Sequence, residues 1–104
     1  MYGLIGRIET TPGGAEELAS ILVEGSTGMP GCLSYVVALA EDDPDSLWVT
    51  EVWDSRESHE ASLELPSVRD AIARGRPLIA GFSDRHVTRP IGGHGVPQVW
   101  PPRG

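Results

Sequence analysis

The stretch LWVTEVWDSRESHEASL, from Leu47 to Leu63, carries a strand pattern followed directly by a helix start. Its first part is rich in β-branched and aromatic residues, which is typical of a β-strand. Apolar side chains alternate onto both faces of this strand: Leu47, Val49 and Trp53 on one, Trp48 and Val52 on the other. A half-exposed antiparallel strand would show a polar row on one face. We therefore expect this strand to be covered on both faces.

A helix is expected directly after this strand. Asp54, with Glu57 three residues later, resembles a capping box, in which the first side chain accepts an early backbone N–H. His59 and Leu63 then lie four residues apart on one face of the helix. This short region thus predicts a buried strand, a capped helix and a histidine that faces the apolar side.

Length, charge and composition exclude several partners and chemistries. The chain has 104 residues, which is enough for one small domain with a modest core. Its net charge of −7 argues against nucleic acid and anionic membranes as partners. Every basic residue is an arginine, so neither a Schiff-base lysine nor a P-loop lysine is available.

The cysteine content and the first residues predict the compartment. Cys32 has no second cysteine to pair with, which fits a reducing environment. The N-terminal segment MYGLIGRIE lacks a basic region followed by a long apolar run, so we expect a strand rather than a signal peptide. No apolar run reaches membrane-spanning length. A soluble, cytoplasmic protein is expected.

The remaining chain divides into short elements separated by turns. Strands are predicted over residues 2–9, 32–40 and 82–89, and a helix over residues 14–26 with an apolar stripe of Leu18, Ile21, Leu22 and Gly25. The acidic turn at residues 41–46 predicts a hairpin between the second and third strands. Pro66 is expected to interrupt the second helix, because its ring removes a hydrogen bond and crowds the preceding turn.

The order β-α-β-β-α-β predicts an α+β, ferredoxin-like fold with both helices on one face of a four-stranded antiparallel sheet. The second strand is apolar on both faces, as is the third, yet two helices cover only one. We therefore expect two such sheets to pack face to face in a homodimer. In this topology Arg7 and Glu51 lie on neighbouring strands, where we expect them to pair.

The last residues differ in composition from the rest. Residues 1–91 are predicted to form the domain, and residues 92–104 a tail rich in glycine and proline. Either this tail is disordered, or its apolar residues Val96, Val99 and Trp100 hold it across a neighbouring subunit.

Five segments together resemble the antibiotic biosynthesis monooxygenase family, a group of dimeric α+β barrels. They are TPG at residues 11–13, MPGCLSY at 29–35, TEVWDSRESH at 50–59, PSV at 66–68 and RPLIAGF at 76–82. The resemblance covers about residues 2–92. It implies the fold, but the same fold carries several activities. Members include cofactor-free oxygenases of quinols and polyketide-type phenols, and haem-degrading enzymes.

The residues that distinguish these branches are partly absent. In the haem-degrading branch an Asn, a Trp and a ligating His would fall at Gly6, Ser62 and Ile72, so the resemblance does not extend to haem degradation. In the quinol-oxidising relatives, histidines align with Ser62 and Ser67. His59 instead lies one turn earlier on the same helix.

The resemblance implies a cofactor-free oxygenase, and the residues of this chain include candidates for each group that such an enzyme needs. A deprotonated phenol or hydroquinone can reduce O₂ directly, so the protein needs a base, a dry pocket and donors for the anion. His59 is the candidate base, and Ser62 the candidate group that orients a substrate oxygen. The candidate walls for an aromatic ring are Trp48, Tyr35 and Phe82. No metal-ligand spacing and no dinucleotide fingerprint occur, so we expect no metal and no cofactor.

Each of these residues also has a simpler interpretation. A histidine between a helix and a sheet commonly packs without reacting, and strand aromatics commonly anchor a core or a dimer interface. The alternative function is therefore a non-catalytic homodimer that binds a small aromatic or apolar ligand. A pocket too small for one ring, or one filled by Trp48 and Phe82, would favour this alternative.

Overall fold

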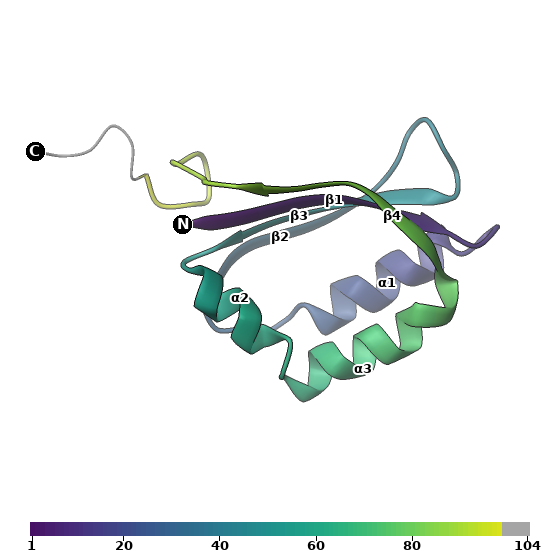
Figure 1. The fold of residues 1–104 in the computed structure, drawn as a ribbon, viewed down its shortest axis with the longest axis horizontal. Helices are drawn as coiled ribbons and strands as arrows, with labels where there is room; N and C mark the ends of the chain where they lie inside the picture. Colours follow the sequence, from purple (N-terminus) through teal and green to yellow (C-terminus); the bar gives the residue numbers. More distant parts are fainter. Residues whose placement is uncertain (99–104) are drawn as a thin grey trace, which may run out of the picture.

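The computed structural model describes residues 1–98. The elements follow the order β1 (Tyr2–Thr10), α1 (Ala15–Gly25), β2 (Cys32–Leu39), β3 (Ser46–Trp53), α2 (Arg56–Ser62), α3 (Pro66–Gly75), a 3₁₀ turn (Arg76–Leu78) and β4 (Ile79–Thr88). All strands pair antiparallel in the order β2-β3-β1-β4, and the helices lie on one face of the sheet (Figure 1). The predicted ferredoxin-like fold and the β2–β3 hairpin are confirmed. No helix in this part of the chain is long and apolar enough to span a membrane.

The hydrophobic core lies between the sheet and α1. Leu18 of α1 packs against Ile8, Leu47 and Val49 of the sheet, and Leu18 and Leu47 are fully buried. Trp53 is 1% exposed, at the end of the same inward row of β3. Burial of such side chains contributes about 2 kcal/mol each. The apolar stripe predicted for the first helix therefore faces the core.

Helices α1 and α3 approach closely because small residues lie between them. A Cβ atom at Gly25 would lie only 2.5 Å from the Cβ of Ala71. Glycine is thus the residue that fits at this crossing. The chain then turns from α3 into β4, which brings β4 to the edge of the sheet beside β1 (Figure 1).

The second predicted helix is two helices. Residues 63–65 separate α2 from α3, and Pro66 occupies the first turn of α3, where its missing N–H costs nothing. The cap of α2 differs from the prediction: Ser55, and not Asp54, accepts the backbone N–H of Ser58 at 3.1 Å. The last strand also begins at Ile79 rather than Phe82, directly after the 3₁₀ turn.

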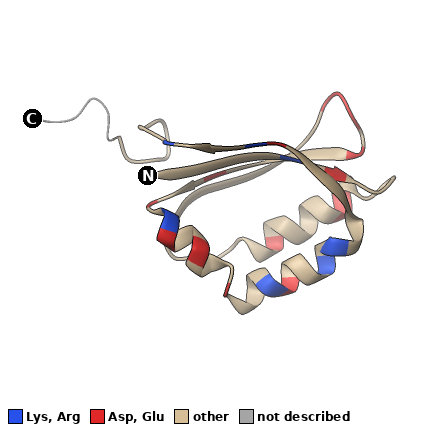
Figure 2. Ribbon diagram, viewed as in Figure 1, with Lys and Arg blue, Asp and Glu red and all other residues tan. Residues whose placement is uncertain are grey.

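The sheet face opposite the helices is not covered in the single chain. Its apolar residues are Ile5, Val36, Ala38, Trp48 and Val52. Ala38 pairs directly with Trp48, and Ile5 and Val36 both pair with Thr50 between them. Arg7 lies on this face too, 5.5 Å above the ring of Trp48, and forms ion pairs with Asp42 and Asp43. The expected Arg7–Glu51 pair is therefore wrong, because Arg7 pairs with two carboxylates of the β2–β3 loop instead. Figure 2 shows acidic residues in this loop.

Candidate active site

Glu51 is a charged residue on the inward row of β3. This row otherwise contains Leu47, Val49 and Trp53, which are buried against the helices. The indole Nε1–H of Trp53 donates to Glu51 Oε1 at 3.0 Å. The Glu51 side chain is 17% exposed, so its charge lies at the edge of the core. A carboxylate in such a place keeps its charge only if donors and cations surround it.

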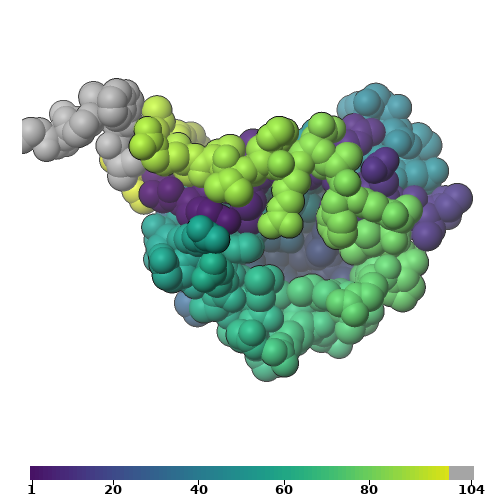
Figure 3. All heavy atoms as spheres, viewed as in Figure 1, coloured from purple at the N-terminus to yellow at the C-terminus, as the bar shows by residue number. Residues whose placement is uncertain are grey.

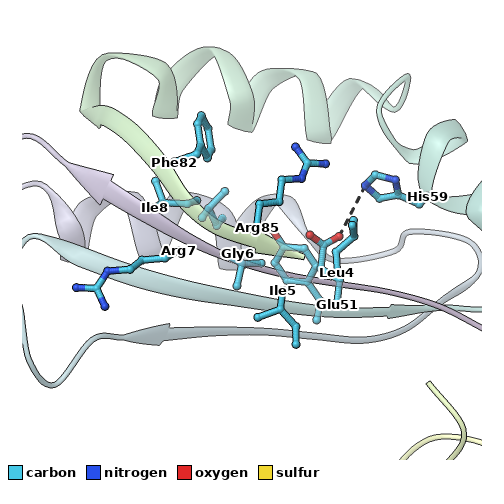
Figure 4. A pocket seen from close by; sticks show the side chains of 12 residues that line it. Leu4, Ile5, Gly6, Arg7, Ile8, Glu51, His59, Phe82 and Arg85 are labelled. Carbon is cyan, nitrogen blue, oxygen red and sulfur yellow. Dashed lines mark ion pairs between the residues drawn. The ribbon is translucent and has the colours of Figure 1, made fainter. Parts of the chain in front are cut away.

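His59 of α2 lies next to this carboxylate. Its Nε2 is 4.0 Å from Glu51 Oε1, and its side chain is 15% exposed (Figure 4). The rings of Tyr2 and Trp53, which are cross-strand partners in the sheet, pack against it, with centroids 5.6 and 5.4 Å from that of the imidazole. The Ser55 cap fixes the start of α2 one turn before His59. The imidazole is therefore held in place by packing, with one nitrogen directed toward a carboxylate.

A cavity of about 170 Å³ opens beside His59 and Glu51, between the sheet and the helices. Its lining residues are Leu4, Ile5, Gly6, Arg7, Ile8, Leu22, Tyr35, Val49, Glu51, His59, Phe82 and Arg85. Figure 3 shows a hollow between β4 and the helices in the same region. A cavity of about 150 Å³ accepts benzene in another protein. This cavity therefore has room for one aromatic ring.

Gly6 helps to keep this space open. A Cβ atom at Gly6 would meet no heavy atom within 4 Å, so any larger side chain would project into empty space. Tyr35 and Phe82, two of the candidate walls for an aromatic ring, line the cavity. Phe82 is 66% exposed, so it lies at the mouth rather than filling the interior.

Tyr35 keeps its proton in this environment. Burial raises the pKa of its phenol far above the usual value, and the nearby Glu51 carboxylate raises it further. The hydroxyl is therefore a hydrogen-bond donor at neutral and moderately alkaline pH. It does not act as a base.

Arg85 reaches the same cavity because β4 contains a bulge. Ser83 pairs with Arg7 and His86 with Ile5, so Asp84 and Arg85 together face Gly6 alone. Asp84 adopts a positive φ of 48°, which is typical of the extra residue in a bulge. Arg85 consequently points toward the helices, above Glu51 (Figure 4). Among residues 1–98 no carboxylate forms an ion pair with it.

A second cavity of about 130 Å³ adjoins the first. It lies among α1, α2 and α3 and shares Leu22, Tyr35, Glu51 and His59 with the ring-sized cavity. Its other lining residues are Gly25, Ser26, Met29, Trp53, Ser62, Leu63, Val68, Ala71 and Ile72. His59 and Glu51 therefore line both cavities.

The comparisons with known proteins agree with this architecture. The model of the family described as antibiotic biosynthesis monooxygenase matches residues 1–74. The chain belongs to this family. The comparison with curated proteins gives no match.

Several solved structures are similar to this chain along most of its length. A protein from Chloroflexus aurantiacus J-10-fl, named as a candidate antibiotic biosynthesis monooxygenase, is 64% identical, with a TM-score of 0.89 over 92% of this chain and 98% of that one. A protein from Deinococcus radiodurans with the same description is 24% identical, with a TM-score of 0.73 over 89% and 95% of the two chains. The protein PA3566 from Pseudomonas aeruginosa is 19% identical, with a TM-score of 0.75 over 88% and 94%. The latter two show a shared fold.

Two of the residues predicted for this antibiotic biosynthesis monooxygenase family member lie elsewhere than expected. Trp48 is on the opposite sheet face, under Arg7, and does not share a cavity with His59. Ser62 is buried and lines the second cavity. Its hydroxyl donates to the backbone carbonyl of His59 at 2.6 Å, so it retains only an acceptor role toward a ligand. The structure thus brings together His59, Tyr35 and Phe82.

Sequence reasoning missed Glu51 and Arg85. The signal for Glu51 was present, because strand alternation places it in the same row as Leu47, Val49 and Trp53. Arg85 had no such signal. Simple alternation from Phe82 would place Arg85 on the opposite face of the sheet, and only the extra residue of the bulge turns it inward. No group of three His, Cys, Asp or Glu side chains suited to a metal ion is present within residues 1–98.

Proposed function

We propose that the chain is a cofactor-independent monooxygenase that oxidises an electron-rich aromatic compound, a quinol or a polyketide-type phenol, with O₂. The observation that carries this proposal is the ring-sized cavity, with His59 and Glu51 at one side and Tyr35 and Phe82 along its walls. Trp48 does not fill this space, and Phe82 stands at its mouth. Membership of the monooxygenase family supports the same reaction class.

The substrate itself supplies the electrons. Loss of a ring hydroxyl proton gives an electron-rich anion that transfers electrons to O₂ and forms a bond between a ring carbon and oxygen. The O–O bond then breaks, one oxygen atom stays on the ring and the other leaves as water. For a hydroquinone the balance is hydroquinone and O₂ on one side, hydroxyquinone and water on the other.

Each residue of the site has a distinct role in this proposal. His59 accepts the hydroxyl proton, and the Glu51 carboxylate stabilises the imidazolium that results. Arg85 provides positive charge for the ring anion, and the protonated Tyr35 donates a hydrogen bond. Phe82 covers the ring and restricts water at the mouth of the cavity.

The proposal includes a homodimer formed through the open sheet face. That face carries five neighbouring apolar residues, and Val36 among them is 53% exposed. A contiguous apolar surface of this kind commonly marks an interface. Packing against a second copy would also exclude water from the underside of the sheet that forms the cavity floor.

The test is O₂ consumption with a panel of hydroquinones and polycyclic phenols. The wild-type protein is expected to consume O₂ with at least one compound, and His59→Gln is expected to lower the rate by about 10²-fold or more. His94→Gln is the matched control, because His94 is exposed and lines neither cavity. An unchanged rate in His59→Gln would overturn the assignment of the base. Binding of aromatics without O₂ consumption would identify a non-catalytic small-molecule-binding protein on the same scaffold.

A further inference from the structure

The second cavity has no task in the proposed reaction. It lies among the three helices and shares Leu22, Tyr35, Glu51 and His59 with the ring-sized cavity. A substrate that ends at its ring would leave this space empty. A largely apolar cavity of about 130 Å³ that opens beside a site is a place where the apolar part of a ligand can be buried.

The walls of this cavity select an apolar occupant. Met29, Val68, Ala71 and Ile72 supply aliphatic or thioether surface among the helices, whereas Tyr35, Glu51 and His59 lie where this cavity meets the ring-sized one. The Ser62 hydroxyl donates to the His59 carbonyl, and the Trp53 indole N–H donates to Glu51. No buried side-chain nitrogen or oxygen in residues 1–98 lacks a hydrogen-bond partner. A polar group placed among these aliphatic side chains would therefore lose its water without gaining a new partner.

The two cavities meet at His59, which fixes how one ligand would occupy both. Leu22, Tyr35, Glu51 and His59 line both spaces. A ring in the first cavity can therefore extend a substituent past His59 into the second. The outer edge of the second cavity opens to solvent, because Leu63 and Ile72 are 44% and 40% exposed.

We propose that the substrate is an aromatic ring with an unbranched apolar substituent, and that this substituent occupies the cavity among α1, α2 and α3. The identity of the ring rests on the proposed function, but the substituent site does not. A cavity of about 150 Å³ holds the six carbons of benzene. The smaller space here holds an alkyl chain of about five carbons, and longer chains emerge between Leu63 and Ile72.

The test measures binding without turnover. Calorimetric titration under anaerobic conditions with 4-alkylphenols, from phenol to 4-octylphenol, gives the dissociation constant as a function of chain length. Affinity is expected to rise about fourfold per methylene, the factor that corresponds to its transfer free energy. The increase is expected to stop at about five carbons, where the cavity is full.

Val68→Phe is the diagnostic variant, because residue 68 lines only the second cavity. It is expected to keep the wild-type affinity for phenol and to lose most of the increase with chain length. Val23→Phe is the matched control, since Val23 is 55% exposed and lines neither cavity. Should Val68→Phe fail to fold, Ile72→Phe at the more exposed edge replaces it.

Two outcomes overturn the inference: affinity that does not depend on chain length in the wild type, or an unchanged dependence in a folded Val68→Phe protein. Absence of O₂ consumption together with an intact dependence on chain length would instead reject the proposed reaction and retain the site. Oxygen consumption without that dependence would reject the substituent site and retain the reaction. The two proposals can thus fail separately.

Discussion

At the scale of single residues, the site depends on one carboxylate in an otherwise apolar row. Glu51 bonds to Trp53, faces His59 and raises the pKa of Tyr35. The sequence places Glu51 on the inward face by alternation, yet it does not say which neighbours it meets. Its pairing with Arg7 was expected from strand order, but the two side chains occupy opposite faces of the sheet.

Substitution of Glu51 tests its effect on His59. Glu51→Gln is expected to lower kcat for O₂ consumption by about tenfold or more, because a neutral amide no longer stabilises the imidazolium. KM is expected to change little, since glutamine has almost the same shape. Steady-state kinetics give both constants, and Glu9→Gln, at an exposed position of β1, is the control. A change in KM alone would contradict the proposed role.

Tyr35 makes the folded state sensitive to alkaline pH. Burial and Glu51 raise its pKa in the folded chain above the ordinary value of 10.0. Above that pH the unfolded chain loses the phenolic proton while the folded chain retains it, so stability is present below pH 10.0 and falls as pH rises further. Urea unfolding at neutral pH and above pH 10.0 is expected to show this loss in the wild type and a smaller loss in Tyr35→Phe. Equal losses in both proteins would contradict the assignment.

At the scale of elements, β4 determines the shape of the cavity. The sequence predicted a strand here but began it at Phe82, whereas β4 starts at Ile79, directly after the 3₁₀ turn of Arg76–Leu78. The bulge at Asp84 was not predicted, since aspartate only weakly favours a positive φ. The bulge nevertheless brings both Phe82 and Arg85 to the cavity.

The backbone conformation of Asp84 gives a prediction for stability. Asp84→Val is expected to lower the free energy of unfolding by about 1–3 kcal/mol, because a β-branched residue does not tolerate a φ of 48°. Asp84→Gly is the control at the same position. It is expected to be nearly neutral, since glycine relieves the strain but adds entropy to the unfolded chain. Urea denaturation measures both, and a neutral Asp84→Val would contradict the bulge.

At the scale of the whole molecule, the fold could be predicted more completely than the site. Helix stripes such as Leu18–Ile21–Gly25 and the two-faced apolar strands determine the layers, because burial must match the period of each element. The site depends on where inward residues from β1, β3, β4 and α2 converge. That convergence depends on register and bulges, which the local sequence encodes weakly.

The open sheet face gives the prediction at this scale. Val36→Arg is expected to convert the proposed dimer into a monomer, because two added charges would be buried face to face. Sedimentation velocity at micromolar concentration distinguishes the two states. Val23→Arg, on the exposed side of α1, is the control and is expected to leave the assembly unchanged. A monomeric wild-type protein would contradict the interface directly.

Asp84, the extra residue of the bulge in β4, also affects how the sequences of relatives are aligned with this chain. Phe82 pairs with Ile8 and Val87 with Leu4, and both pairs face inward although five positions separate them along β4. A homologue that lacks the counterpart of Asp84 would have an unbroken ladder with the same inward side chains. In such a homologue, the counterpart of Arg85 lies two residues after the counterpart of Phe82. A gap at position 84 therefore aligns that residue with Arg85, whereas an ungapped alignment matches it to Asp84.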